Sequence, residues 1–283
     1  MLTEGLVVVH ECLGEEEQML RRLVLKGPIA KTAKAGQFVA VQVQDSSIPS
    51  FDPLLRRPIS LAEISPDQDE ITLLYRVQGR GTKILARARC GERLSVMGPL
   101  GKGFSLPEVG ELWLVAGGIG IFPLYALAQS ALAQGLIVRL FWGGENESFL
   151  KSAGLRTWQA LGISIYPSTL DGTLGDKGLV TEQVQGRLSQ LFGQTKQANH
   201  SSTGQISVAT CGPKKMMQAV TELCMNFAVP VQVSLEEHMG CAVGACLGCV
   251  CNLIDEAGTL SHRKVCQDGP VFRGEEVVWN VSC

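Results

Sequence analysis

The stretch LWLVAGGIGIFPL, residues Leu112–Leu124, decides the fold class of this chain. Its first part, Leu112–Ala116, is predicted to be a short buried strand. The run Gly117-Gly118-Ile119-Gly120 follows directly, and Pro123 stands at the start of a predicted helix. A strand, a glycine turn and a helix in this order form the phosphate loop of dinucleotide-binding sheets. The glycines do not follow the G-x-G-x-x-G order, so the prediction depends on this context.

Beyond this stretch, apolar strands alternate with helices. Such alternation predicts an α/β domain over residues 106–235, in which helices wrap a parallel sheet and NAD binds. Residues Gln194–Gly204 form a polar loop between two of the elements. The predicted strands are Leu112–Ala116, Ile137–Trp142, Ile163–Pro167, Ile206–Thr210 and Val231–Ser234, and the predicted helices are Phe122–Gln134, Phe149–Leu161, Leu179–Phe192 and Lys214–Phe227.

The tripeptide Cys211-Gly212-Pro213 ends the fourth predicted strand of this domain. In a doubly wound sheet the carboxyl ends of the strands face the ligand. Cys211 is therefore a candidate for the nicotinamide pocket, and a buried small residue is the alternative.

Residues 1–105 have the pattern of an antiparallel β-barrel. Their short segments are apolar or alternating, and glycine or proline lies between most of them. One helix is predicted over Lys83–Arg87. The predicted strands are Leu6–His10, Leu20–Leu25, Gln37–Val43, Pro58–Ala62, Ile71–Val77 and Arg93–Met97.

Two segments of the predicted barrel carry residues suited to a flavin nucleotide. In Arg57-Pro58-Ile59-Ser60, the guanidinium suits a phosphate and the Ser60 hydroxyl a flavin ring atom, although neighbouring arginines are usually a solvated edge. Leu74-Tyr75-Arg76 precedes Gly81-Thr82, where a helix begins and offers free amides to a pyrophosphate. Tyr75 is either a wall for a ring or a core residue. The run Met97–Phe104 predicts a ligand loop and a domain linker about equally.

Four cysteines near the C-terminus have the spacing of a plant-type [2Fe–2S] site. Cys241, Cys246 and Cys249 form a C-x4-C-x2-C block, and Cys266 is the distant fourth thiolate. Zinc is the alternative, because two cysteines separated by two residues also suit zinc, but small residues between the cysteines favour iron–sulfur. Cys251 is predicted to be a buried apolar residue. Residues 236–283 are taken as the cluster-binding segment, with possible strands at Val250–Ile254 and Val277–Val281.

Composition excludes several classes of protein. The chain has 283 residues, 45% of them hydrophobic and 18% charged, with a formal net charge of −2, which argues against disorder and against nucleic acid as a partner. Residues 112–138 carry no charge, but the glycine turn and Pro123 interrupt this run, so a buried strand and helix explain it better than a membrane span. The crowded cysteines and the absence of a signal peptide pattern in Met1–His10 predict a cytoplasmic protein.

Taken in this order, the segments resemble the ferredoxin reductase-like superfamily, and within it the electron transfer subunits of NAD-linked, type B dihydroorotate dehydrogenases. The most specific part of the resemblance is the cysteine block joined to Val265–Phe272. The polar loop Gln194–Gly204 and His238, where an arginine is common, depart from the family pattern. The other matching stretches are Leu55–Ser60, Leu74–Thr82, Met97–Phe104, Val115–Leu124, Thr210–Pro213 and Ser234–Cys251.

The resemblance implies one FAD, one [2Fe–2S] cluster and an NAD site. It places FAD on Arg57–Ser60, Leu74–Arg76 and Gly81 with Thr82, and the cluster on the four cysteines. It also implies a partner subunit that oxidises dihydroorotate on its own FMN, in a heterotetramer with two subunits of each kind. In this arrangement the chain relays electrons to NAD in pyrimidine biosynthesis. The relay runs through cofactors, so the resemblance implies no catalytic side chain. The alternatives are a reductase subunit that serves a hydrogenase, a sulfur reductase or ferredoxin, and a non-catalytic zinc-stabilised binding module.

Overall fold

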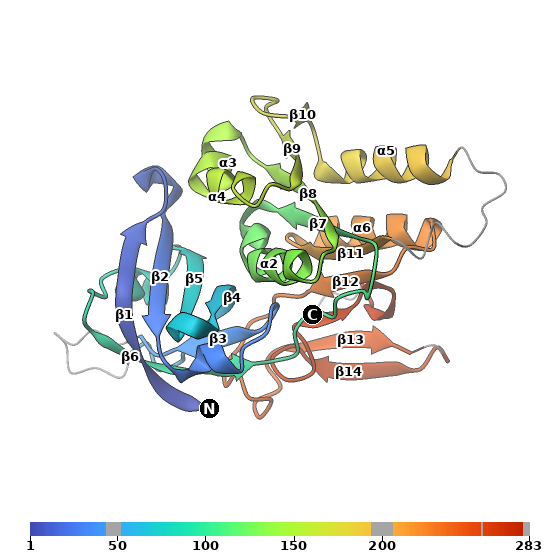
Figure 1. Ribbon diagram of the computed structural model, residues 1–283. Helices are drawn as coiled ribbons and strands as arrows, with labels where there is room; N and C mark the ends of the chain where they lie inside the picture. The colour runs from blue at the N-terminus through green and yellow to red at the C-terminus, as the bar shows by residue number, and fades with distance from the viewer. Residues whose placement is uncertain (44–51, 194–205, 256, 280–283) are drawn as a thin grey trace.

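A computed structural model describes residues 1–43, 52–193, 206–255 and 257–279. The predicted loop Gln194–Gly204 lies outside these residues. Three parts are visible in Figure 1: a blue to cyan barrel on the left, a sheet with helices at the upper right, and a small red lobe beneath the sheet. The predicted combination of an antiparallel barrel, a parallel-sheet domain and a C-terminal cysteine segment is confirmed.

The barrel is closed by six antiparallel strands in the order β1-β2-β5-β4-β3-β6. Every predicted strand of this region is present, and apolar side chains that alternate along the strands fill the interior. The helix α1, Arg80–Leu85, follows β5 and begins three residues before its predicted start. The strands are β1 (Leu2–Cys12), β2 (Leu20–Lys26), β3 (Phe38–Val41), β4 (Arg57–Ser65), β5 (Glu70–Arg76) and β6 (Arg93–Leu100).

The second part is a seven-stranded sheet in the order β10-β9-β8-β7-β11-β12-β15. The first six strands run parallel to one another, and β15 runs antiparallel to β12. The five predicted strands are its centre, whereas β10 and β15 were not predicted. The strands are β7 (Glu111–Gly117), β8 (Ile137–Gly144), β9 (Ser164–Thr169), β10 (Asp176–Lys177), β11 (Ile206–Cys211), β12 (Val231–Ser234) and β15 (Val271–Arg273).

Helices cover both faces of this sheet, because alternate residues of its central strand are apolar on both sides. Trp113 and Val115 belong to the core under α5 and α6, and Leu114 and Ala116 belong to the core under α2, α3 and α4. One helix predicted over Phe149–Leu161 is wrong, because Gly154 has φ of +103° and divides it into α3 and α4. The helices are α2 (Tyr125–Ala133), which a 3₁₀ turn at Gly118–Leu124 precedes, α3 (Glu147–Ser152), α4 (Leu155–Gln159), α5 (Val180–Phe192) and α6 (Lys214–Asn226).

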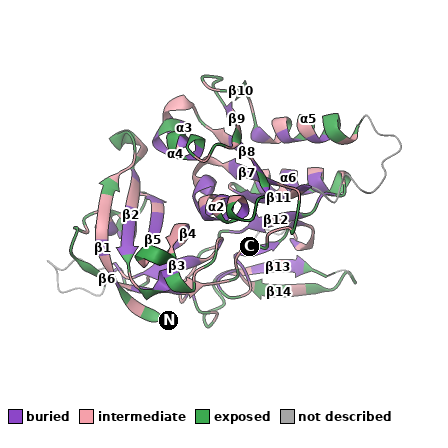
Figure 2. Cartoon of the chain, viewed as in Figure 1, coloured by how far each residue is buried: buried purple, intermediate pink, exposed green. Residues whose placement is uncertain are grey.

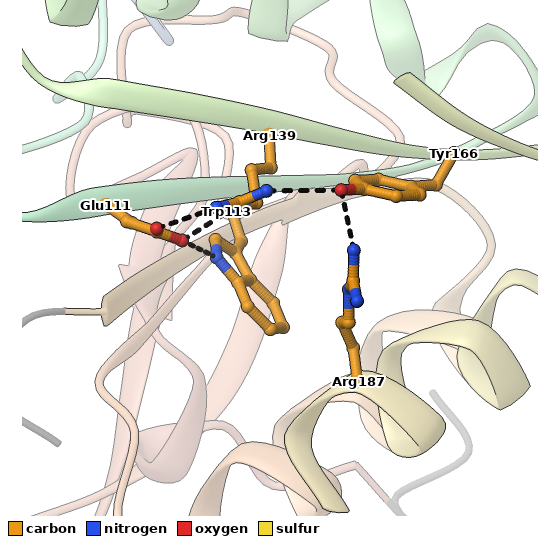
Figure 3. A network of polar contacts seen from close by, with 5 residues as sticks. All are labelled: Glu111, Trp113, Arg139, Tyr166 and Arg187. Atoms are coloured by element: carbon orange, nitrogen blue, oxygen red, sulfur yellow. Dashed lines mark hydrogen bonds and ion pairs between the residues drawn. The ribbon is translucent and has the colours of Figure 1, made fainter. Parts of the chain in front are cut away.

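A polar network ties three neighbouring strands to α5 (Figure 3). Glu111 of β7 accepts hydrogen bonds from Arg139 Nε at 2.7 Å and Nη2 at 2.9 Å, and from the indole of Trp113 at 2.9 Å. The Tyr166 hydroxyl of β9 accepts from Arg139 at 3.1 Å and from Arg187 of α5 at 2.9 Å. The pKa of Glu111 is lowered, mainly by the hydrogen bond from Arg139.

The red lobe holds the cysteine segment. Its strands β13 (Val250–Ile254) and β14 (Leu260–Lys264) are antiparallel, and β13 is more buried than β14, which is largely exposed (Figure 2). The strand predicted over Val277–Val281 is wrong in its described part, because a 3₁₀ turn at Gly274–Glu276 leads only to a single bridge between Val277 and Leu253. Within the described part of the chain, none of the helices has the length and apolar composition needed to cross a bilayer.

Candidate functional site

One cavity of about 760 Å³ is bounded by all three parts of the molecule. The barrel contributes Arg76, at the end of β5. The sheet contributes the turns that follow its strands, among them Gly117–Gly120 after β7 and Gly212–Pro213 after β11. The lobe contributes Cys251 and Asn252 of β13. The cavity therefore lies where a doubly wound sheet binds its ligand.

Close backbone packing joins the two glycine turns at the floor of this cavity. A Cβ at Gly120 would overlap the carbonyl of Cys211, and a Cβ at Gly212 would lie 2.9 Å from the amide nitrogen of Gly117. Gly212 also has φ of +154°. The indole of Trp142 donates a hydrogen bond to the Gly118 carbonyl at 3.1 Å and fixes the first turn. The structure thus packs the backbones of the two predicted turns directly against each other.

Two residues predicted for the NAD site lie beneath its surface. The Cys211 side chain is 1% exposed and does not line the cavity, and burial raises the pKa of its thiol. Pro123 is buried inside the 3₁₀ turn and does not line the cavity either. The alternative of a buried small residue therefore fits Cys211.

The predicted flavin segments meet on the outside of the barrel. The Arg57 side chain lies against Gly81, where a Cβ would overlap Arg57 Nε, and Arg57 Nη1 donates to the Leu55 carbonyl at 2.5 Å. Ser60 and Leu74 are on adjacent strands, since Leu61 pairs with Leu73. The structure therefore brings the predicted flavin segments, which are separated in the sequence, close together on the barrel.

Other residues of these flavin segments have structural roles. Tyr75 is 5% exposed inside the barrel, and its hydroxyl and His10 Nε2 are 2.9 Å apart, so the alternative of a core residue fits it. Ile59 also points into the barrel core, while Pro58 is exposed at the edge. The Thr82 hydroxyl accepts from the amides of Gln78 and Gly79 at the start of α1.

The linker prediction fits the run Met97–Phe104, which ends β6 and does not line the main cavity. It contacts the lobe through a hydrogen bond of 2.5 Å from the Lys102 amide to the Gly269 carbonyl.

Arg76 connects the barrel to the cavity. Its guanidinium carbon lies 5.3 Å from the ring centroid of Phe149 of α3, and its Nε is buried without a hydrogen-bond partner among the described residues. Arg76 also lines the cavity, and a guanidinium there fits a phosphate or another anionic group of a nucleotide.

The cysteine loop directs backbone amides at sulfur. Cys241 Sγ accepts from the amides of Val243 at 3.5 Å, Ala245 at 3.2 Å and Cys246 at 3.3 Å. The first of these bonds is the largest cause of the lowered pKa of Cys241, which falls to about 6. Cys246 Sγ accepts from the Gly248 amide at 3.4 Å. Such amides stabilise thiolates and suit a negatively charged cluster.

The four thiols form two pairs. The Cys241 amide donates to Cys246 Sγ at 3.5 Å, and the Cys266 amide donates to Cys249 Sγ at 3.4 Å. Cys249 and Cys266 are buried, while Cys246 is exposed. In the described ranges, no group of three or more His, Cys, Asp or Glu side chains is arranged to hold a single ion. Two pairs of thiols fit two irons, each with two protein ligands.

Cys251 lies near these pairs but is a buried core residue, as predicted, with 7% of its surface exposed. Burial raises its pKa to about 12.

Comparison with known proteins agrees with both the cysteine segment and the dinucleotide-binding sheet. Residues 236–278 match the family model "Iron-sulfur cluster binding domain of dihydroorotate dehydrogenase B", and residues 114–222 match "Oxidoreductase NAD-binding domain". The electron transfer subunit of dihydroorotate dehydrogenase B (NAD(+)) from Bacillus pumilus (strain SAFR-032) is 37% identical over 92% of each chain. The corresponding subunit from Bacillus cereus (strain B4264) is 37% identical over 98% of this chain and 99% of that one.

The chain belongs to this family of electron transfer subunits. Its cysteine segment is therefore an iron–sulfur domain, and the zinc alternatives are wrong. A solved structure of an NADH-dependent reduced ferredoxin-NADP oxidoreductase is 26% identical over 98% of this chain and 90% of that one, with a TM-score of 0.77. The ferredoxin reductase of carbazole 1,9a-dioxygenase shares the fold, with 20% identity over 82% of this chain and 68% of that one and a TM-score of 0.64.

Several cavity residues were missed by the sequence analysis. Phe149, Lys214, Lys215 and Glu236 line the cavity, but the sequence analysis gave none of them a role. Glu236 follows a correctly predicted strand at its carboxyl end, so the rule that placed Cys211 would have found it.

Proposed function

We propose that this chain is the electron transfer subunit of an NAD-linked dihydroorotate dehydrogenase, in which electrons from a dihydroorotate-oxidising FMN subunit reach NAD⁺ through a [2Fe–2S] cluster and FAD. The observation that carries this proposal is the single cavity bounded by Arg76 of the barrel, the glycine turns of the sheet and Cys251 of the lobe. A relay needs its three groups close together, and this cavity borders all three parts that would hold them.

In this proposal each part of the chain holds one group. Arg57, Ser60 and Arg76 hold FAD, because Arg57 is fixed against Gly81 and Arg76 lines the cavity. The turns at Gly117–Gly120 and Gly212–Pro213 hold the NAD pyrophosphate at the cavity floor. When bound, the flavin supplies the exchange between single electrons and a hydride, and the protein supplies position and electrostatics.

The cysteine loop is the proposed point of electron entry. Cys241, Cys246, Cys249 and Cys266 are the proposed cluster ligands. Cys246 and the apolar tip residues Val243 and Leu247 are exposed, whereas Cys249 and Cys266 are buried. We therefore propose that the partner contacts the outer pair of ligands and that the inner pair faces the rest of this chain.

The remaining features of the proposal concern organisation. We propose a division at residues 1–105, 106–235 and 236–283, although β15 of the last segment completes the sheet of the second. We also propose two copies of each subunit and a cytoplasmic location.

A reconstitution experiment tests the proposal. The FMN subunit from the same organism is produced with and without this chain. Dihydroorotate-dependent reduction of NAD⁺ is then followed by the absorbance of NADH. We expect the pair to reduce NAD⁺ and the FMN subunit alone to fail. Absence of NAD⁺ reduction by a pair that contains flavin and iron would contradict the proposal.

A role as a reductase for ferredoxin is the second candidate, because of the likeness to the NADH-dependent ferredoxin-NADP oxidoreductase. Purification of the chain from its own cells separates the two, since a ferredoxin or another reductase subunit would then accompany it in place of the FMN subunit.

A further inference from the structure

The glycine turn after β7 lies midway along the main cavity. β7 lies between β8 and β11 in the sheet, and the turn Gly117–Gly120 lines the cavity between its two ends. The outer end is lined by Glu145 and Leu170, which follow β8 and β9, and the opposite end by Cys251 of the lobe. A dinucleotide that spans the cavity therefore passes its central pyrophosphate over this turn. This step rests on the proposed function.

The Trp142 side chain holds this turn from within the sheet domain. Trp142 of β8 pairs with Ala116 of β7, and its side chain is 0% exposed. Its indole nitrogen donates a hydrogen bond to the Gly118 carbonyl at 3.1 Å. Trp142 does not line the cavity, whereas Gly118 does. The turn is therefore held by a side chain that has no surface of its own in the cavity.

Packing restrains the start of this turn but not Gly118. A Cβ at Gly117 would lie 2.6 Å from Met216 Sδ, so the backbone there is enclosed. A Cβ at Gly118 would meet no atom of the described residues within 4 Å, its neighbours in the chain aside, and Gly118 has φ of +56°. Glycine adopts either sign of φ readily, so its backbone is easily reoriented. The hydrogen bond from Trp142 restrains the turn at this open point.

The direction of the Gly118 carbonyl also sets the direction of the next amide. The peptide bond between Gly118 and Ile119 is trans and planar, so the Gly118 C=O and the Ile119 N–H point in opposite directions. The carbonyl points to the buried indole of Trp142, and the Ile119 N–H therefore points away from it. Both Gly118 and Ile119 line the cavity.

We propose that Trp142 is a positioning residue for the dinucleotide. Its indole N–H orients the peptide between Gly118 and Ile119 so that the Ile119 amide donates a hydrogen bond to the pyrophosphate. A donor that is oriented before the ligand arrives loses less freedom on binding, which raises affinity. Trp142 exchanges no electron or hydride in this scheme and does not touch the nucleotide.

Trp142→Phe tests the proposal, and Trp113→Phe is its matched control. Phenylalanine keeps an aromatic ring but has no N–H donor. Trp113 of β7 is 1% exposed, and its indole donates a hydrogen bond to Glu111 at 2.9 Å. Each variant therefore replaces a buried indole and removes one hydrogen bond, but the bond of Trp113 does not involve the glycine turn.

Dissociation constants are measured by calorimetry on the complex with its partner subunit and cofactors. The ligands are NAD⁺ and ADP-ribose, which keeps the pyrophosphate and lacks the nicotinamide. In Trp142→Phe we expect both ligands to bind roughly five-fold more weakly, or about 1 kcal/mol, as for the loss of one hydrogen bond. In Trp113→Phe both constants should stay within about two-fold of the wild type, because distant sites act independently.

Hydrogen exchange at saturating NAD⁺ shows where the effect lies. NAD⁺ should slow the exchange of the amides of residues 118–121 in the wild type and in Trp113→Phe. In Trp142→Phe this protection should fall, while the protection of residues 145–147 at the outer end should remain. Full protection of residues 118–121 in Trp142→Phe would overturn the proposal.

A second substitution covers the case in which Trp142→Phe does not fold. At position 142, 3-benzothienylalanine keeps the shape of the indole and replaces its N–H by sulfur. It should weaken both ligands as Trp142→Phe does. Wild-type affinity in a folded protein with this replacement would overturn the proposal, because the N–H alone has been removed.

Three further results are decisive. Equal weakening in Trp113→Phe and Trp142→Phe would overturn the proposal, because a general loss of stability would explain both. Weaker binding of NAD⁺ without weaker binding of ADP-ribose would also overturn it, because the effect would then lie at the nicotinamide. If the wild type binds neither ligand, the proposed function fails together with this inference. If the wild type and Trp142→Phe bind both ligands equally, only this inference fails.

Discussion

Arg57 lies against Gly81 because the backbone of α1 approaches β4 where no side chain intervenes. In this position no carboxylate among the described residues forms an ion pair with the guanidinium. We expect Arg57→Ala to weaken FAD binding roughly ten-fold or more, since a hydrogen bond to a charged group contributes about 1.5–3 kcal/mol. Flavin retained after dilution and gel filtration, measured by absorbance, checks this expectation.

Gly81→Ala provides a matched variant, because the added methyl group would overlap Arg57 Nε and displace the guanidinium while keeping its charge. It should release flavin as Arg57→Ala does. A full flavin complement in both variants would show that Arg57 does not bind the phosphate.

Cys246 is the exposed member of the outer thiol pair, so a serine there leaves the core intact. We expect Cys246→Ser to lose the [2Fe–2S] cluster and keep FAD, because the interior of the barrel packs as a hydrophobic cluster of its own that contains no residue of the lobe. Iron content and visible absorbance report the cluster. NADH should still reduce a dye, while dihydroorotate-dependent reduction of NAD⁺ should stop.

Cys90→Ser is the control for this variant, since Cys90 is exposed on the barrel and outside the cysteine block. It should retain iron, flavin and coupled activity. Coupled activity at the wild-type level in Cys246→Ser would refute its assignment as a ligand.

At the scale of the elements, the pair of Glu111 and Arg139 joins β7 to β8. Both side chains are mostly buried, with 22% and 28% exposed, and the contact has two hydrogen bonds. We expect Glu111→Gln to lower the free energy of unfolding by about 1.5–3 kcal/mol, since it weakens a charged hydrogen-bonded pair. For a chain of this size that corresponds to a fall of several degrees in the unfolding temperature.

The dependence on pH follows from the lowered pKa of Glu111. A carboxyl with a lowered folded pKa stabilises the fold fully above its unfolded value near 4.5 and loses this effect as the pH falls through the folded value. The difference between Glu111→Gln and the wild type should therefore be constant from pH 6 to pH 8. Glu108→Gln, at an exposed site, should unfold like the wild type. Equal unfolding temperatures for all three proteins would contradict a stabilising role of the pair.

The elements that the sequence predicted are those with a regular apolar pattern. The barrel strands and the five central strands of the sheet have this pattern, and all are present. β14 was missed because Leu260–Lys264 is mostly polar and exposed, and β15 because its three residues are too few for a pattern. Gly154 was not recognised as a break because the apolar spacing continues across it.

For the molecule as a whole, the sequence located the candidate site only in part. Three of the four cysteines lie within nine residues of one another, so their spacing alone indicated a cluster. The approach of Arg76 to Phe149 depends on how the barrel docks on the sheet, which no local pattern contains. The position of Tyr75 was left open for a related reason: a strand residue faces either the barrel interior or its outside, and the motif does not say which.

The outer end of the cavity determines which dinucleotide fits the assembled molecule. Glu145 and Leu170 line this end, after β8 and β9. Asp171 beside them is held as an anion, because its carboxylate accepts from the amide and the hydroxyl of Thr173, which lowers its pKa. These carboxylates disfavour the extra phosphate of NADP. One cation also lies near this end, Lys177 of β10, whose side chain lies along Gly172.

We expect NADH to be preferred over NADPH by roughly ten-fold or more in kcat/KM, or about 1.4 kcal/mol. Dye reduction by the purified protein measures both efficiencies.

Leu170→Arg should reduce the preference for NADH over NADPH, since it places a guanidinium at the same end of the cavity, where it can bind a 2′-phosphate. Lys177→Ala is the matched variant: a fall in NADPH activity alone would show that Lys177 already reaches the phosphate. Equal efficiencies in the wild type would mean that the adenosine ribose lies elsewhere, near Lys214 and Lys215, and would reverse the orientation of the dinucleotide in the cavity.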